Sequence, residues 1–288
     1  MRVKGFLSLR TLGEFVRWEH SIFALPFVYM GALLAAGGLP GWRVMVLVTI
    51  AAVAARTSAM SINRIVDRQL DALNPRTKDR SLVTGRVKLG QAVGLAVAST
   101  LTLAVAAAGL NRLAFYLSPI PVAAFVIYPY TKRFTWACHA FLGLAQSFGP
   151  MGGWIAVRGR LDLPAVVLGL AVGLWIGGFD LLYALMDIDF DRWHGVYSFP
   201  ARFGVKATLM LARIVHAVVL VLLGSLYWWV GLGWFYGLGL AVTAWLLWSE
   251  HRLVSPDDLS RVNRAFFDMN GWISVVMFAG TLLDVLLR

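Results

Sequence analysis

The sequence predicts an all-α, polytopic membrane protein with about nine transmembrane helices, and three observations support this prediction. First, 59% of the 288 residues are hydrophobic, whereas soluble domains contain about 45–50% apolar residues. Second, the apolar residues gather into runs that are long enough to cross a hydrocarbon core about 30 Å thick. Third, basic residues are concentrated in alternate connections between these runs. The runs occupy residues 21–38, 43–66, 89–110, 112–130, 137–157, 164–186, 207–230, 231–249 and 268–287.

The segment before the first run lacks the apolar core of a cleavable signal peptide. Its apolar residues follow a helical spacing, so we expect a helix that lies on the membrane surface. These residues are Phe6, Leu7, Leu9, Leu12, Phe15 and Val16.

The formal net charge of +11 is explained by topology, because basic residues collect in cytoplasmic loops. With nine spans and a cytoplasmic N-terminus, 19 of the 26 Lys and Arg residues fall on the cytoplasmic side and five on the other side. The remaining two, Arg56 and Arg213, lie inside spans. We therefore expect a multi-pass protein of the cell membrane, embedded in the lipid bilayer, without a nucleic-acid partner. The single cysteine, Cys138, excludes a disulfide framework and a cysteine-rich metal site.

Two connections are long and charged, at residues 67–88 and 187–206, and both fall on the predicted cytoplasmic side. The connection near residues 250–267 contains Ser255 and Asp258 at the spacing of a helix-capping box, which predicts a short surface helix. No linker rich in Pro, Gly or Ser divides the chain, so residues 1–288 are expected to form a single domain.

A weak internal repeat divides this domain into two halves, about residues 1–136 and 137–288. Each half has a polar residue followed by aspartates four and eight positions later, at the cytoplasmic end of an apolar run. The offset between the two sets is 120 residues at every position. Paired halves of this kind commonly face each other across a site in membrane proteins. The sets are Asn63, Asp67 and Asp71 in the first half, and Tyr183, Asp187 and Asp191 in the second.

The two aspartate pairs predict a metal site. Residues four apart lie on one face of a helix, and acidic groups near a bilayer usually mark a functional site or a water-filled cavity. Four carboxylates without an adjacent Cys or His suit a hard cation, and Mg²⁺ fits best because substrate phosphates usually complete its coordination. The alternative is an ordinary solvated loop with charged helix ends, which the second pair at identical spacing disfavours.

Basic residues near these pairs indicate an anionic substrate. Tyr128, Lys132 and Arg133 lie in YPYTKRFT at the cytoplasmic end of the fourth run, and Arg76 and Arg80 follow the first aspartate pair. Lys and Arg neutralise phosphate charge, although positive-inside topology explains any single one of these residues better.

Arg56 differs from the loop cations because it lies seven residues before Asn63, about 10 Å deeper in the membrane at about 1.5 Å per residue. A guanidinium at that depth needs an anionic partner or water. Either an aspartate of the cluster or the carboxylate of a substrate would meet that need.

With these motifs the sequence resembles the UbiA superfamily of intramembrane aromatic prenyltransferases. Its first signature, Asn-Asp-x-x-Asp-x-x-x-Asp followed by Arg-Thr-x-x-Arg, is similar to NRIVDRQLDALNPRTKDRSLVTG. Its second, an Asp-x-x-x-Asp motif with a third aspartate between, is similar to YALMDIDFDRWHGVYSFPARFG. YPYTKRFT and WEHSIFALPF resemble the fourth and first helices of that superfamily.

One departure from the signature is Arg64, which stands where the superfamily usually has an aspartate. Arg64 is expected to lie off the face that carries Asp67 and Asp71, so metal binding should survive. Like Arg68, it is expected to serve topology.

The resemblance implies nine transmembrane helices around a central cavity, capped by the two cytoplasmic loops. It also implies Mg²⁺-dependent transfer of a polyprenyl group from polyprenyl diphosphate to an aromatic acid, 4-hydroxybenzoate or a related precursor, in respiratory quinone biosynthesis. A dihydroxynaphthoate is the alternative acceptor.

The resemblance also implies a set of site residues. Asp67 with Asp71 would hold one Mg²⁺ ion, and Asp187 with Asp191 a second, with Asn63 as an auxiliary ligand. Lys132 would neutralise the diphosphate as part of the catalytic set. The expected substrate-binding residues are Arg80 and Arg133 for the diphosphate charge, Tyr128 and Tyr183 for its position, Arg56 for the acceptor carboxylate, and Asp189 for acid–base steps or loop order.

Two other classes of protein share some of these features. A secondary transporter also has repeated halves and intramembrane charges, but it predicts acidic residues near the middle of the membrane. A CDP-alcohol phosphotransferase also uses aspartate-bound metal, but its compact DGxxAR-type core is missing from the sequence.

Overall fold

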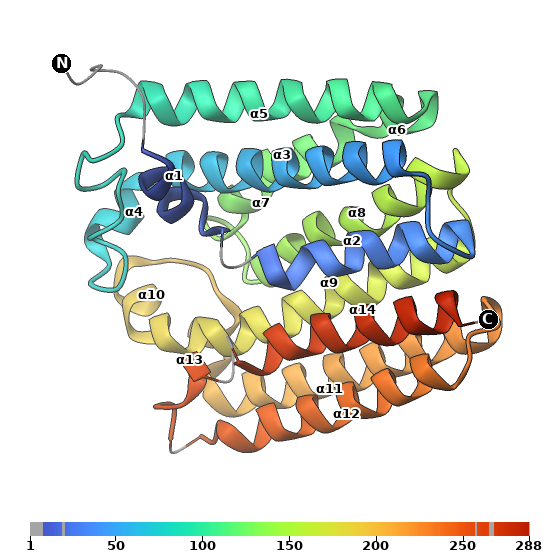
Figure 1. Cartoon of the computed structure of the whole chain (residues 1–288). Helices are drawn as coiled ribbons and strands as arrows, with labels where there is room; N and C mark the ends of the chain where they lie inside the picture. Colours follow the sequence, from blue (N-terminus) through green and yellow to red (C-terminus); the bar gives the residue numbers. More distant parts are fainter. Residues whose placement is uncertain (1–7, 19–20, 257, 265–267, 288) are drawn as a thin grey trace.

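The computed structural model describes residues 8–18, 21–256, 258–264 and 268–287, which form a bundle of helices that run side by side (Figure 1). These residues contain no β-strand, only an isolated antiparallel bridge between Ser255 and Asp258. The prediction of an all-α protein is therefore confirmed for the part of the chain that the structure describes.

The first half of the chain begins with the predicted surface helix, α1 (Leu9–Val16), whose N-terminus is capped by the Ser8 hydroxyl. The fourth predicted run is divided at Ser118, because Pro119 has no N–H to continue the preceding helix. The longer helices of this half are α2 (Ser21–Ala36), α3 (Trp42–Val66), α5 (Leu89–Leu110), and the consecutive pair α6 (Arg112–Leu117) and α7 (Pro119–Thr131).

The second half consists mainly of α8 (Cys138–Arg158), α9 (Leu163–Tyr183), α11 (Phe199–Trp229), α12 (Trp234–Leu253) and α14 (Asn270–Leu286). Helix α11 begins eight residues before the predicted run, but its backbone is not helical at Gly204 (φ 80°, ψ 175°), so a short first segment precedes the long helix. The first segment has a strong start signal, because the Ser198 hydroxyl caps it and Pro200 lies in its first turn.

Five helical segments are long and apolar enough to cross a membrane: Trp42–Val66, Leu89–Leu110, Arg112–Thr131, Leu163–His194 and Phe199–Trp229. Phe23–Ala36 and Asn270–Leu286 are apolar but shorter. Helices α8 and α12 have sufficient length but carry polar side chains that face other helices, such as the buried Glu250. The described residues thus contain five candidate membrane spans, and the predicted count of nine is not confirmed.

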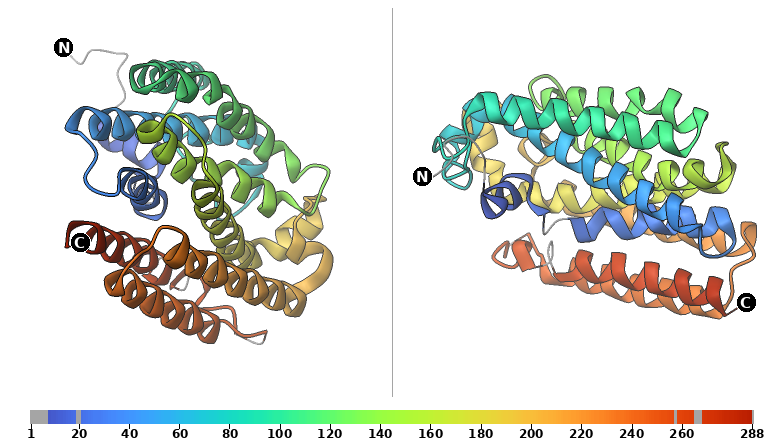
Figure 2. Two further views of the ribbon diagram at one scale, coloured as in Figure 1. Left: turned by 90° about the vertical axis from the view of Figure 1, so that its right-hand side faces the viewer. Right: turned by 45° about the horizontal axis from the view of Figure 1, so that its top comes forward.

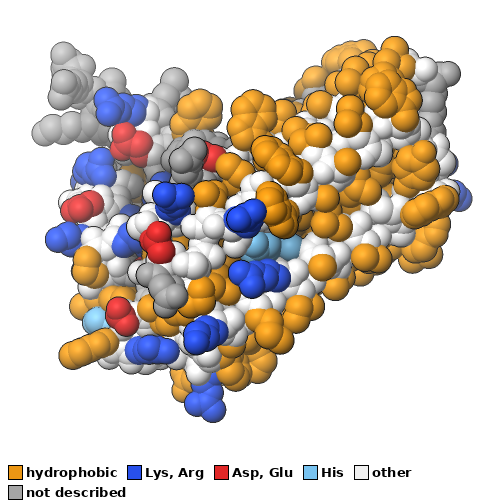
Figure 3. All heavy atoms as spheres, turned by 90° about the horizontal axis from the view of Figure 1, so that it is seen from below, with side chains coloured by type: hydrophobic (Ala, Val, Ile, Leu, Met, Phe, Trp, Pro, Cys, Tyr) orange, Lys and Arg blue, Asp and Glu red, His pale blue; other side chains and the backbone are white. Residues whose placement is uncertain are grey.

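The outer surface of the bundle agrees with a bilayer environment. Large apolar side chains are exposed along the helices, including Val105 (72%) in α5 and Val221 (70%) in α11. One face of the molecule shows hydrophobic side chains over the helices, whereas charged side chains gather toward one end (Figure 3). This distribution is typical of a protein whose helices lie in lipid and whose charged end meets water.

Glycines allow the central helices to approach closely. A Cβ atom at Gly143 of α8 would lie 2.4 Å from the backbone oxygen of Gly173 in α9. A Cβ atom at Gly153 of α8 would lie 2.1 Å from the backbone oxygen of Val28 in α2. Backbone contact through small residues is a common way for helices to associate in membranes, and it fixes α8 between α2 and α9.

A buried polar network joins the helices of the second half. Asn270 of α14 donates to Glu250 of α12 at 2.7 Å, and it accepts a hydrogen bond from the Trp175 indole of α9 at 2.8 Å. His216 of α11 lies 3.7 Å from the second carboxylate oxygen of Glu250. Glu250 and Asn270 are both fully buried, so this network connects four helices inside the apolar bundle.

Short helices and the charged connections gather at one end of the bundle (Figures 1 and 2). They are α1, α4 (Arg68–Leu73), the 3-10 turn Ala184–Asp187, α10 (Ile188–His194) and α13 (Val262–Arg264). The predicted capping contact exists, since the Ser255 hydroxyl accepts the N–H of Asp258 at 3.1 Å. It closes a turn rather than starting a helix there, and the single-turn α13 begins only at Val262.

Candidate active site

The first aspartate pair lies where α3 ends and α4 begins. Asp67 is the residue after the last turn of α3, and its N–H donates to the Asn63 carbonyl at 2.9 Å. The Asn63 side-chain amide donates to the Asp67 carboxylate, also at 2.9 Å. Asp71 follows one turn later in α4. Both carboxylates are buried, with residue exposures of 1% for Asp67 and 7% for Asp71.

Cations from other segments meet this pair. The Lys132 ammonium, just after α7, donates to the Asp67 carboxylate at 2.5 Å. The Arg80 guanidinium, in the first charged connection, donates to Asp71 at 2.5 Å. Charge-assisted contacts of this kind are stronger than neutral hydrogen bonds, so they offset part of the cost of burying the two carboxylates.

Arg133 has a mainly structural set of contacts. Its guanidinium donates to the Val66 carbonyl at 2.7 Å and to the Pro129 carbonyl at 3.1 Å. It lies 3.8 Å from Asp67. These contacts satisfy one carbonyl at the C-terminus of α3 and one near the C-terminus of α7, and they hold the end of α7 beside the aspartate pair.

The second aspartate pair is bound by the first charged connection. Arg76 forms a two-pronged ion pair with Asp187, and it also donates to the Tyr183 hydroxyl at 2.9 Å. The Asn74 amide donates to Asp187 at 3.0 Å. Asp191, in α10, accepts a hydrogen bond from Ser198 at 2.6 Å. The loop of one half therefore reaches the acidic motif of the other half.

The ion pair also raises the pKa of Arg76. Burial lowers the pKa of Arg76, but the hydrogen bond to Asp187 and the negative charge of its carboxylate raise this pKa more strongly. The result is a pKa above the ordinary value for arginine, so the Arg76 guanidinium in this contact stays protonated at physiological pH.

A charged cavity of about 330 Å³ lies between the two aspartate pairs. Five basic side chains and three aspartates line it, so its lining has a net positive charge. The basic residues are Arg17, Arg56, Arg64, Arg80 and Lys132, and the aspartates are Asp180, Asp187 and Asp191. Such a lining suits a polyanion together with a cation that the carboxylates can bind.

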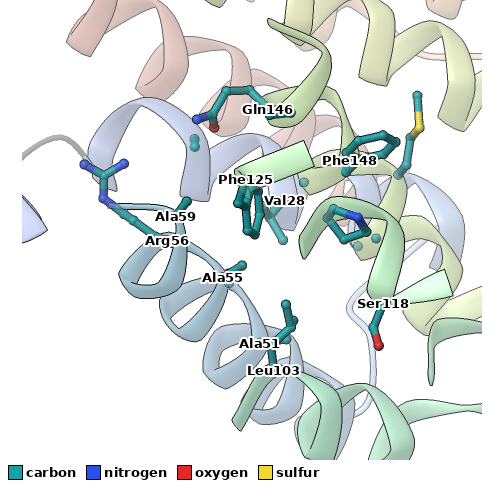
Figure 4. Close-up of a pocket in the computed structure, with 18 of the residues that line it drawn as sticks. Val28, Ala51, Ala55, Arg56, Ala59, Leu103, Ser118, Phe125, Gln146 and Phe148 are labelled. Atoms are coloured by element: carbon teal, nitrogen blue, oxygen red, sulfur yellow. The ribbon is translucent and has the colours of Figure 1, made fainter. Parts of the chain in front are cut away.

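An apolar cavity of about 390 Å³ adjoins the charged one. Figure 4 shows the small side chains of Ala51, Ala55 and Ala59 along one wall, on successive turns of α3, with Arg56 at one end. Residues that line both cavities include Arg56, Met60, Tyr128, Leu142 and Gln146. The two cavities therefore share a boundary, and together they fit a molecule with an anionic head and a hydrocarbon tail.

Most of the residues expected at the site from the sequence lie together here. Asp67 and Asp71 sit directly behind Lys132 and Arg80, which line the cavity. Asp189 is exposed and does not line either cavity. The residues that line the charged cavity as expected are Arg56, Asn63, Arg80, Tyr128, Lys132, Tyr183, Asp187 and Asp191.

The expectation that Arg64 lies away from the aspartates is wrong. Arg64 is only 5% exposed, lines the charged cavity and lies 4.0 Å from the Asp71 carboxylate. Arg64 belongs to α3 and Asp71 to α4, so the change of direction at Asp67 brings the Asp71 carboxylate within reach of Arg64, which spacing along one continuous helix does not predict. Arg68 is exposed, as expected of a residue that serves topology.

Two further residues of the site were missed in the sequence. Asp180 of α9 and His139 of α8 both line the charged cavity, and their side chains form a hydrogen bond of 2.7 Å. Asp180 lies seven residues before Asp187, the same spacing that relates Arg64 to Asp71. His139 carries no comparable signal, because its partner is 41 residues away in the chain.

The donor set fits Mg²⁺ only in part. The carboxylate oxygens of the two pairs are hard ligands of the type that Mg²⁺ prefers. Within the described residues, however, no group of three or more acidic, histidine or cysteine side chains converges on one point. An ion here would therefore need oxygen ligands from a bound phosphate to complete its coordination.

Taken together, the fold and the two cavities define an intramembrane enzyme that acts on an amphiphilic substrate with an anionic head. Residues 24–274 match the family model of the UbiA prenyltransferase family. The chain is 32% identical over 260 residues to a 4-hydroxybenzoate octaprenyltransferase of Nitrosospira multiformis, covering 90% of this chain and 88% of that protein. The chain therefore belongs to the UbiA prenyltransferase family.

Solved structures support this assignment. The apo structure of a UbiA homolog from Aeropyrum pernix K1 matches with a TM-score of 0.85 and 36% identity, over 93% of this chain and 98% of that one. A UbiA homolog from Archaeoglobus fulgidus bound to DMAPP and Mg²⁺ matches with a TM-score of 0.76 and 18% identity, over 96% and 99%. The second likeness establishes the shared fold alone.

Proposed function

We propose that this enzyme transfers a polyprenyl group from polyprenyl diphosphate to the ring of 4-hydroxybenzoate in a Mg²⁺-dependent reaction of respiratory quinone biosynthesis. The observation that carries the proposal is the junction of a charged cavity with an apolar one. The relative from Nitrosospira multiformis has this acceptor in its name. DMAPP or GPP with Mg²⁺ is bound in structures of the Archaeoglobus fulgidus homolog.

The diphosphate is assigned to the charged cavity, where Lys132 and Arg80 neutralise its charge. Two Mg²⁺ ions are assigned to the aspartate pairs, one to Asp67 and Asp71 with Asn63, and one to Asp187 and Asp191. When bound, these ions supply positive charge that stabilises the diphosphate as its bond to the allylic carbon breaks. Tyr128 and Tyr183 position the diphosphate, and Arg133 reinforces its neutralisation.

The apolar cavity is assigned to the prenyl tail. Its alanine and leucine lining keeps water from the carbocation that forms when the diphosphate departs. Asp189 is assigned to ordering the α10 loop, because it lies outside both cavities.

Arg56 is assigned to the carboxylate of the acceptor. It lies at the boundary of the two cavities, where an acceptor ring meets the allylic carbon. Its guanidinium donates to the Arg17 carbonyl at 2.8 Å, which fixes its position. A dihydroxynaphthoate carries the same carboxylate on a larger ring and is the alternative acceptor.

The same proposal includes the topology. A single domain of two pseudo-repeated halves, about 1–136 and 137–288, crosses the cell membrane nine times around the central cavities. The N-terminus and both charged connections face the cytoplasm, which agrees with the gathering of charged side chains at one end of the bundle.

Product mass spectrometry tests the function directly. The purified chain is incubated with one polyprenyl diphosphate, Mg²⁺ and a panel of aromatic acids that includes 4-hydroxybenzoate and a dihydroxynaphthoate. We expect a prenylated benzoate, and loss of product in folded Asp71→Ala and Asp191→Ala proteins. Full activity in either variant would remove the metal assignment. Solute flux in vesicles without any need for polyprenyl diphosphate would instead indicate a transporter.

A further inference from the structure

Arg64 is a buried arginine that donates no hydrogen bond to any residue that the structure describes. A guanidinium carries five N–H donors, and buried polar groups are nearly always hydrogen-bonded. The Arg64 residue is 5% exposed. Among the described residues, none accepts a hydrogen bond from it, and its only ion contact is Asp71 at 4.0 Å. These donors line the charged cavity, so they are available to a ligand there.

The charges around Arg64 favour an anion as that ligand. Arg80 and Arg17 are close enough to act electrostatically on Arg64, and both also line the cavity. Asp71 is the nearest carboxylate, and it already accepts a hydrogen bond from Arg80 at 2.5 Å. Arg64 and Arg80 thus share the Asp71 carboxylate, and a further negative charge in the cavity would stabilise these two guanidinium groups.

The proposed reaction brings two anionic groups into the site, the diphosphate and the acceptor carboxylate, and the position of Arg64 indicates which of them it contacts. Arg56 lines both the charged and the apolar cavity, as expected for contact with an acceptor ring. Arg64 lines only the charged cavity, beside Asp71 and Arg80. Its location therefore matches the diphosphate rather than the acceptor carboxylate.

We propose that Arg64 binds the diphosphate directly and gives this chain an affinity for diphosphate that does not require Mg²⁺. This inference rests on the proposed function, which supplies the diphosphate substrate. The guanidinium of Arg64 provides paired N–H donors that suit phosphate oxygens. Its contribution remains when divalent cations are removed, whereas the contribution of the aspartate pairs depends on them.

The test measures binding of inorganic diphosphate to the full-length purified chain in EDTA, by isothermal titration calorimetry. Loss of one hydrogen bond to a charged group weakens binding by about tenfold to hundredfold. We expect this loss for Arg64→Gln and a smaller one for Arg64→Lys, which keeps the charge but not the paired donors. The matched control is Arg68→Gln, which removes the same charge from an exposed position four residues away and should bind as the wild type does.

Circular dichroism and size-exclusion chromatography confirm the fold of each variant, and Arg64→Lys serves as the test if Arg64→Gln does not fold. Wild-type affinity in a folded Arg64 variant, with EDTA present, would overturn the proposal. So would normal diphosphate binding together with weaker binding of 4-hydroxybenzoate, which would assign Arg64 to the acceptor. The binding measurement uses inorganic diphosphate and does not depend on prenyl transfer. A chain that binds diphosphate but transfers no prenyl group would therefore contradict the proposed function without contradicting the role of Arg64.

Discussion

Lys132→Met removes the ammonium group that contacts Asp67 while keeping most of the length of the side chain. The Asp67 side chain is 2% exposed, and the Lys132 ammonium lies 2.5 Å from it. The Asn63 amide remains as a hydrogen-bond donor to the carboxylate, whereas the nearest remaining cation, Arg133, is 3.8 Å away. In the variant, the buried Asp67 carboxylate therefore keeps its Asn63 hydrogen bond but loses its nearest cation, which destabilises the fold.

The size of the effect follows from these contacts. A hydrogen bond between charged groups contributes about 1.5–3 kcal/mol, and Lys132 is 28% exposed at its side chain, which reduces its contribution toward the lower part of that range. We expect the free energy of unfolding to fall by about 2 kcal/mol. For a chain of this size each kcal/mol corresponds to a Tm shift of about 2–4 °C, so Tm should fall by about 4–8 °C.

Thermal unfolding in detergent with EDTA measures this shift, with the exposed Lys78→Met as a matched control. Mg²⁺ should restore part of the lost stability, because a divalent cation can compensate Asp67 in place of Lys132. The double variant Asp67→Asn/Lys132→Met should be more stable in EDTA than Lys132→Met alone, since the uncompensated charge is gone. An unchanged Tm in Lys132→Met, or a double variant less stable than the single one, would refute this account.

Three other predictions follow from the structure. Arg56→Ala should raise the KM for a carboxylated acceptor about tenfold or more with little change for the prenyl donor, and an unchanged KM in steady-state kinetics would end its assigned role. Gly143→Ala should destabilise the fold because its Cβ would meet Gly173, whereas Gly152→Ala has open space and should be neutral in thermal unfolding. The raised pKa of Arg76 means that its contribution to stability is complete below the ordinary pKa of arginine and is lost only above its raised value. The stability difference between wild type and Arg76→Gln should therefore be constant from about pH 6 to pH 9, and a steep change in that window would contradict the assignment.

Hydrophobic runs predicted the helices well because lipid requires long, continuous apolar segments. Every predicted run contains a helix, although Pro119 divides one of them and Ser198 starts another early. The number of membrane crossings is harder to predict. A helix such as α8, packed between α2 and α9 by glycine contacts, needs less apolar surface than a helix that faces lipid.

The site was predictable where it depends on spacing within one helix, and less so where it depends on contacts between helices. The four-residue spacing correctly predicted that Asn63 lies beside Asp67. The same spacing identified the second motif, Tyr183, Asp187 and Asp191. The partnership of His139 with Asp180 crosses from α8 to α9, and nothing local in the sequence specifies it. The position of Arg64 beside Asp71 could not be predicted for a different reason, because α3 ends at Val66 and Asp71 lies in the separate helix α4.

The buried network of the second half has a consequence for how the protein is made. Ribosomes deliver α12 to the membrane before α14 exists, so Glu250 arrives without Asn270, its hydrogen-bond donor in the finished structure. A carboxylic acid in lipid without a partner is costly, so α12 must remain shielded by the insertion machinery or by α9 and α11 until translation ends. A nascent chain that stops before Asn270 should therefore be a preferred substrate for membrane quality control, although most of its sequence is present.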